Sequence, residues 1–182
     1  MQSLRNLILL LVIVSISATG GYFLYTEILK EKDTTEEVEN NEVTEQQNIV
    51  EVLLNENLST LVTAIDKAEL RSTLETGEYT VFAPTNEAFS TLGDTLDNLL
   101  KDENKESLQD VLKYHVVMGK VRAEDLKNNQ SIETLSGGKL TVLIENDNVY
   151  LQDESGQKVM VVKVDLEAEN GVVHVIDRVL LK

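Results

Sequence analysis

The sequence predicts an α+β fold, with helices in the first half of the domain and a hairpin-rich sheet in the second half. Up to about Tyr114, apolar residues recur every three or four positions, which is the spacing of amphipathic helices. From Ser131 onward, short alternating runs are separated by Gly, Asn and Asp turns, as in β-hairpins. This order of elements predicts a compact β-wedge with helices packed on it.

Composition divides the 182 residues into three parts. Residues 1–30 contain an uncharged run from Leu7 to Tyr25, long enough for an apolar helix that crosses a bilayer. Residues 31–47 hold seven acidic side chains and one lysine, which predicts a disordered acidic linker. Residues 48–182 have the length of one ordinary domain, with no internal repeat.

The apolar segment allows two interpretations. As a retained anchor it makes a single-pass membrane protein with the domain outside the cytoplasm, because Arg5 stays on the cytoplasmic side. As a secretory signal it is cleaved near Gly20, after the small residues Ala18 and Thr19, and the domain is secreted or periplasmic. Both interpretations export the domain.

Local signals place the helices in order. Asn48 and Glu51 form a capping-box pattern at the start of a helix over 48–54, and a second helix is expected to run from Leu58 to about Leu70. A strand from Tyr79 leads into Pro84, after which Thr85 or Asn86 can cap a helical turn. Further helices are expected over 95–100, 105–114 and 122–126. The 105–114 helix aligns Leu108, Val111, Leu112 and His115 on one face.

The second half reads as strands joined by tight turns. Turn residues separate the expected strands 132–135, 140–145, 149–152 and 158–166. The last strand follows the Asn170-Gly171 turn, and Val, Ile and Leu dominate it, which predicts a strand covered on both faces.

Three segments together carry a family resemblance. They are Tyr79-Thr80-Val81-Phe82-Ala83-Pro84-Thr85-Asn86-Glu87-Ala88-Phe89, Tyr114-His115-Val116-Val117, and Asn170-Gly171-Val172-Val173-His174-Val175-Ile176-Asp177. In this order they resemble the boxes of the fasciclin domain, and the resemblance covers about residues 48–181. It implies a fasciclin-like β-wedge that binds a protein or a matrix polysaccharide. Met118 stands where many family members have proline, a change expected to loosen one turn.

Structural roles are expected for the residues of these boxes. His115 and His174 are each predicted to be core histidines with hydrogen-bonded rings, because neither has a neighbouring ligand or nucleophile. Pro84, Thr85, Asn170 and Gly171 are expected to hold turns and caps.

Three residues are candidates for contact with a partner. Tyr114 is expected to lie partly outside the core. Asp165 and Leu166 fall where some animal fasciclin proteins carry an integrin-like Asp-Ile pair, although Lys163-Val164 and Glu167 depart from that motif. A carboxylate beside an exposed aliphatic side chain suits a receptor's metal ion and a shallow pocket. The alternative is a strand end followed by a solvated turn.

The sequence offers little for catalysis. There is no cysteine and no Gly-x-Ser-x-Gly motif, and the two histidines are 59 positions apart. We therefore assign no metal, cofactor or catalytic residue, and we do not expect the chain to be an enzyme. Its 32 acidic and 16 basic residues make nucleic acid an unsuitable partner. The sequence therefore predicts a non-catalytic adhesion or interaction module at the cell surface. The alternative is a periplasmic or cell-wall domain that binds or senses a small ligand.

Overall fold

The structure, a computed structural model, describes residues 47–181, which belong to one compact unit bounded by Thr44 and Lys182. The expected anchor (1–30) and nearly all of the acidic linker (31–47) lie outside the described residues, and these boundaries stay predictions. From residue 47 to residue 181, no helix combines the length and the apolar character that a membrane span requires.

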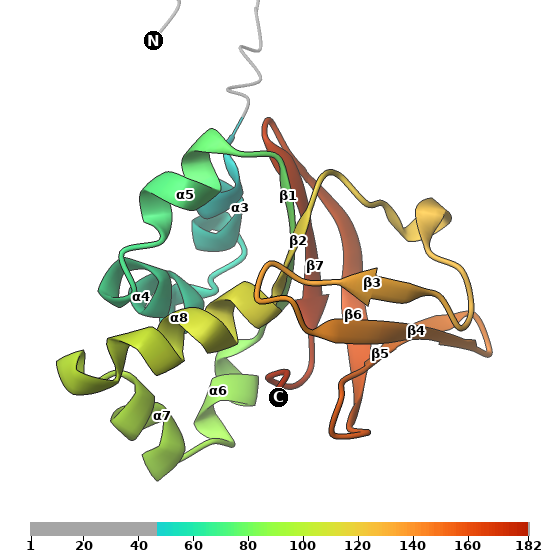
Figure 1. The fold of residues 1–182 in the computed structure, drawn as a ribbon. Coiled ribbons are helices and arrows are strands. Elements are labelled where there is room, and N and C mark those ends of the chain that lie inside the picture. Colours follow the sequence, from blue (N-terminus) through green and yellow to red (C-terminus); the bar gives the residue numbers. More distant parts are fainter. Residues whose placement is uncertain (1–46, 182) are drawn as a thin grey trace, which may run out of the picture. The chain divides into compact units, whose positions relative to one another are not determined.

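Helices form one layer of this unit and most of the sheet lies opposite (Figure 1). The helices are α3 (Ile49–Asn55), α4 (Ser59–Lys67), α5 (Arg71–Thr76), α6 (Asn86–Ser90), α7 (Asp94–Leu99) and α8 (Lys105–Tyr114), with short 3-10 turns η1 (Asp102–Asn104) and η2 (Ala123–Asp125). The strands are β1 (Tyr79–Pro84), β2 (Val116–Met118), β3 (Ser131–Glu133), β4 (Lys139–Glu145), β5 (Asn148–Gln152), β6 (Lys158–Ala168) and β7 (Gly171–Ile176).

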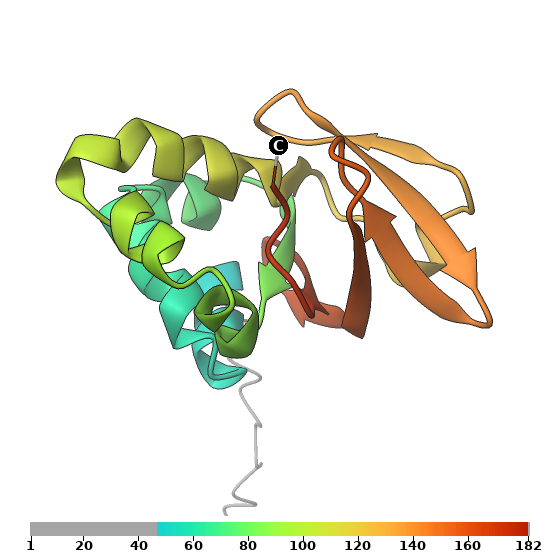
Figure 2. The same cartoon turned by 90° about the horizontal axis from the view of Figure 1, so that it is seen from below.

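The seven strands form a single sheet in the order β2-β1-β7-β6-β5-β4-β3. Strand β7 runs parallel to β1 and antiparallel to β6, and each of its residues is buried. The backbone N–H of Leu135, just after β3, donates to the carbonyl of Val116 in β2, which brings the two ends of the sheet together. Figure 2 shows the helices on one side of β1 and β7 and the β3–β6 wedge on the other.

Side chains cap the first turns of α3 and α6 at the positions that the sequence predicts. Asn48 and Glu51 make both bonds of a capping box at the start of α3. Thr85 caps α6 by accepting from the N–H of Ala88. Asn86 instead reaches across to α4, where its amide accepts from Thr60 N and donates to the Asn57 carbonyl. The end of β1 is thereby fixed to the helical layer.

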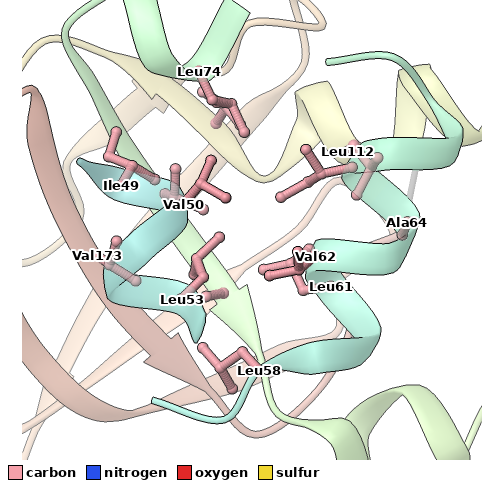
Figure 3. Packing of buried hydrophobic residues seen from close by; sticks show 14 of the residues in the cluster. Ile49, Val50, Leu53, Leu58, Leu61, Val62, Ala64, Leu74, Leu112 and Val173 are labelled. Atoms are coloured by element: carbon pink, nitrogen blue, oxygen red, sulfur yellow. The ribbon is translucent and has the colours of Figure 1, made fainter. Parts of the chain in front are cut away.

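Two apolar cores lie on either side of β1 and β7. Figure 3 shows the helix-side core, in which side chains from α3, α4, α5 and α8 meet Val173 of β7. The wedge-side core gathers residues of β4, β5, β6 and β7 around Phe82 and Tyr114. Because β7 supplies both cores, its run of β-branched residues is necessary on both faces.

The turn before β7 clasps the helices to the sheet. Asn170 accepts from Ile49 N at the start of α3 and donates to the carbonyls of Leu74 and Gly77. At Gly171 a Cβ atom would lie 2.0 Å from the carbonyl oxygen of Tyr79, a distance that no side chain tolerates. The Asn-Gly pair therefore serves packing as well as the turn.

The α+β class and the order of elements are confirmed by the structure. Three elements have no counterpart in the sequence prediction: α5 (Arg71–Thr76), η1 (Asp102–Asn104) and β2 (Val116–Met118). The last strand is shorter than the apolar run that predicts it, because the chain bends at Asp177 and the rest of the run packs without strand pairing.

Candidate functional site

His115 occupies the C-cap position of α8 and is 2% exposed. Its Nδ1 lies 2.7 Å from the carbonyl oxygen of Val111, and its Nε2 accepts from the backbone N–H of Leu180 at 3.0 Å. A carbonyl oxygen only accepts, so the ring proton must sit on Nδ1. Burial lowers the pKa of His115 to about 4, against an ordinary 6.5, and the bond to Val111 opposes this shift.

His174 lies in β7, fully buried, and its ring stacks on Phe82 with 5.6 Å between ring centroids. Its Nδ1 accepts from the N–H of Asp165 at 3.2 Å, and its Nε2 lies 2.9 Å from the carbonyl oxygen of Val121. The proton must therefore sit on Nε2, the opposite tautomer to His115. Both rings use both nitrogens on the backbone, which leaves neither nitrogen for a metal or a substrate.

Tyr114 is 1% exposed, so the expectation that it lies partly outside the core is wrong. Its hydroxyl donates to the Lys139 carbonyl and accepts from the Glu154 N–H, both at 3.1 Å. Burial is the largest cause that raises the pKa of this phenol. Tyr114 thus fastens α8 to the wedge, and a partner could reach it only if the wedge opened.

Asp165 marks an irregular, solvent-exposed part of β6, called here the β6 corner and defined as residues 162–167. Asp165 has a φ of 55°, and the pairing of β6 with β7 shifts twice, between Val161 and Lys163 and between Lys163 and Leu166. The Asp165 N–H donates to His174, and its Oδ1 accepts from the N–H of Ala123 at 2.8 Å. The buried histidine therefore holds the backbone of Asp165, and η2 holds its carboxylate.

The exposed aliphatic residue next to Asp165 in the sequence is Val164, and not Leu166 as the sequence indicates. Leu166 pairs with Val173 and packs, half-buried, against the helix-side core. Val164 is 40% exposed and Val162 is 51% exposed. Leu166 has a partner in β7, whereas Val162 and Val164 lie where the register shifts and have none.

An ion pair borders the β6 corner. Arg122 Nε lies 2.7 Å from Glu167 Oε1, and both side chains are about half exposed. On the other side, Lys163 reaches Glu56 at the end of α3, at 2.7 Å. Such exposed pairs add little stability, but they fix the charged rim of a surface whose centre is Asp165 and Val164.

The described residues hold few other polar groups suited to chemistry. Within residues 47–181, no three His, Cys, Asp or Glu side chains cluster as a metal site would require. The Asp153 carboxylate is buried, and its Oδ1 accepts from Ser155 and Gln157 while Oδ2 has no protein partner. It lies in the β5–β6 turn, where Oδ1 makes the bonds of a local turn.

A cavity of about 20 Å³ lies between α4, α5, α8 and the first strands. Leucine, isoleucine and valine side chains form most of its wall, with Thr73, Lys113 and His115. This volume is close to that of a single water, and the apolar wall keeps such a space dry. A metabolite would fit only after the helices moved apart.

Comparison with known proteins places this arrangement in a family. A model of the Fasciclin domain matches residues 56–182. The chain belongs to the Fasciclin domain family. The match covers both histidines, Asn170 and the β6 corner.

Two relatives come from Synechocystis sp. (strain ATCC 27184 / PCC 6803 / Kazusa). Protein sll1483 is 39% identical over 93% of this chain and 95% of its own length, and uncharacterized protein sll1735 is 38% identical over 74% and 97%. Transforming growth factor-beta-induced protein ig-h3 of Sus scrofa is 34% identical over 74% of this chain, which spans only 19% of that larger protein.

A solved structure with a similar fold is a domain pair from the insect cell adhesion molecule Fasciclin I. It is 21% identical, with a TM-score of 0.45, and the match covers 71% of this chain and 43% of that chain.

Proposed function

We propose that this chain is a non-catalytic interaction module, displayed outside the cytoplasm, which binds a protein or a matrix polysaccharide through the β6 corner. Adhesion is the function that membership of the Fasciclin domain family suggests. The observation that carries the proposal is the exposed Asp165, whose carboxylate accepts from Ala123 N and whose N–H donates to His174. Both imidazoles are bonded to the backbone and are not offered to a partner.

The chemistry of the corner suits recognition. Asp165 offers a carboxylate that accepts from the N–H of Ala123, on a backbone held by His174, and its neighbour in the sequence, Val164, offers an exposed aliphatic side chain. A rigid carboxylate loses little conformational entropy on binding, and an aliphatic neighbour adds the hydrophobic contribution. In this proposal Asp165 keeps the role predicted for it, and Val164 takes the place of Leu166.

Display outside the cell rests on the uncharged segment Leu7–Tyr25 and the acidic stretch that follows it. With the anchor retained, the domain stays within the reach of a short flexible linker from the outer face of its membrane. Protease added to intact cells should release the domain and leave residues 1–30 in the membrane fraction. Protection of the domain until the cells are lysed would refute display.

The binding test uses the purified full chain, immobilised, and envelope extract of the cells that produce it. The double variant Asp165→Asn, Val164→Ser should lower saturable capture about tenfold, because it removes one charge and one aliphatic contact. Asn keeps an oxygen for Ala123 and accepts a positive φ, so the fold should survive. The matched control is Asp147→Asn, an exposed aspartate with a φ of 63° in the β4–β5 turn. Equal capture by wild type and double variant would exclude the β6 corner.

A further inference from the structure

The segment after β7 is held by a bond that depends on the protonation of a histidine. After the bend at Asp177 the chain carries Val179 into the helix-side core and Leu180 into the wedge-side core. Leu180 is fully buried, and its N–H donates to Nε2 of His115. Figures 1 and 2 both show this red segment between the helices and strands β3–β6.

We propose that His115 is an acid-sensitive latch for the segment 178–181. In the neutral ring Nε2 is an acceptor and holds Leu180. A proton on Nε2 turns it into a donor that faces another donor, the Leu180 N–H, inside the core. The bond is then lost and two buried N–H groups oppose each other, so acid favours release of the segment.

Nearby charged groups do not replace this bond or neutralise the ring. On α8, Lys113 lines the same cavity as His115, and a second cation there cannot favour a protonated ring. Asp177, just before the segment, and Arg178, its first residue, are exposed, and the Asp177 carboxylate accepts from Met160 N. Thr73 and Leu135, which reach the cavity from α5 and from the turn after β3, carry no charge. Burial is the main reason that the folded ring resists protonation.

A second tether on the segment does not titrate. The amide of Gln157 donates to the carbonyl of Val179 at 3.0 Å. Acid should therefore loosen Leu180 while Gln157 still holds Val179. The bond from Leu180 to His115 should therefore depend on pH, and the bond from Gln157 to Val179 should not, so the two can be compared in the same protein.

The size of the effect follows from the ring's two pKa values, about 4 when latched and about 6.5 when released into solvent. The equilibrium constant for opening should be about 30-fold larger at pH 5 than at pH 7.5, because at pH 5 the released ring is protonated and the latched ring is not. The direction of the pH dependence follows from these values: the latched state is most stable above pH 6.5 and becomes less stable, relative to the released state, as the pH falls towards 4.

The test is hydrogen–deuterium exchange of the full chain in mild detergent, with labelling times scaled for the intrinsic pH dependence of exchange. The C-terminal peptide 177–182 should lose protection about 30-fold between pH 7.5 and pH 5, and at both pH values it should be less protected than a core-strand peptide covering 140–151, because the segment opens without global unfolding. Unchanged protection of 177–182 would overturn the proposal. So would equal protection of both peptides at each pH, because the segment would then be released only by global unfolding.

Two variants sharpen the test. Gln157→Ala should raise exchange of the peptide 177–182 by a similar factor at both pH values, with the pH slope retained. His115→Gln keeps a neutral acceptor near Leu180 and should remove the slope. If His115→Gln fails to fold, the comparison of wild type with Gln157→Ala still decides: a slope abolished by Gln157→Ala would contradict the latch.

Discussion

Asn170 offers the sharpest mutational test of how the helices are attached to the sheet. Its side chain makes three hydrogen bonds, to Ile49 N and to the carbonyls of Leu74 and Gly77, at 3.0, 2.5 and 3.0 Å. Asn170→Ala removes all three and leaves the N–H of the fully buried Ile49 without that partner. At about 1 kcal/mol for each bond, we expect a loss of about 3 kcal/mol in the free energy of unfolding.

The measurement is urea unfolding of the unit Thr44–Lys182, which contains both cores, followed by circular dichroism. The midpoint should fall with an unchanged m-value, since the surface exposed on unfolding is the same. Asn148→Ala is the control, because the Asn148 amide makes only an exposed bond to Asn146 in a turn, and it should change stability by less than about 0.5 kcal/mol. A loss below about 1 kcal/mol for Asn170→Ala would refute the clasp.

Asn170→Asp tests the direction of those bonds. The substitution keeps the shape of the side chain but points a carboxylate oxygen at the carbonyls of Leu74 and Gly77. Repulsion and desolvation then add to the lost bonds, so the cost should exceed that of Asn170→Ala. A milder effect for Asp than for Ala would mean that the amide nitrogen does not face those carbonyls.

Three further predictions concern single groups. Thr80 is fully buried, and its hydroxyl donates to Gly119 O and accepts from Val121 N. Thr80→Val should therefore lower the free energy of unfolding in urea by about 2 kcal/mol. A loss as small as that for Thr63→Val, whose hydroxyl makes an exposed bond to Ser59 O, would contradict this prediction. Glu69 follows the end of α4 with a φ of 58°, a conformation that glycine adopts without strain. Glu69→Gly should therefore raise the free energy of unfolding by roughly 0.5–1 kcal/mol, although it removes the exposed ion pair with Lys105. A lower free energy of unfolding would show that the ion pair contributes more than the relief of backbone strain. Because the pKa of His115 is lowered to about 4 in the folded state, its contribution to the free energy of unfolding is fully present above pH 6.5. About 3 kcal/mol of that free energy should be lost as the pH falls to 4, seen as a falling urea midpoint. A urea midpoint that does not change over this pH range would contradict the prediction.

The sequence predicts best the elements whose signals are local. The α8 helix matches its expected range, 105–114, because Leu108 and Leu112 repeat with helical spacing and both are buried. The caps at Asn48 and Thr85 follow from side chains that bond three residues ahead. In contrast, α5 has a single buried residue, Leu74, and β2 has three residues, so neither gives a periodic pattern to detect.

The candidate site was harder to predict because long-range contacts create it. Tyr114 looks amphipathic in sequence, but its hydroxyl partners lie 25 and 40 residues further along the chain. Leu166 lies opposite Val173 and turns inward, and the sequence alone does not give this register of β6 against β7. Asp165 stays a predicted contact residue, and its bond to His174 could be seen only in three dimensions.

The most direct test of a non-catalytic, backbone-clamping role for the histidines is their tautomeric state in solution. Long-range proton–nitrogen NMR of labelled protein at pH 7 should show two neutral rings, with the proton on Nδ1 in His115 and on Nε2 in His174. Both assignments should persist when metal ions are added. A charged ring, a shared tautomer, or a nitrogen signal that shifts on adding zinc would show that an imidazole is free to react or to bind.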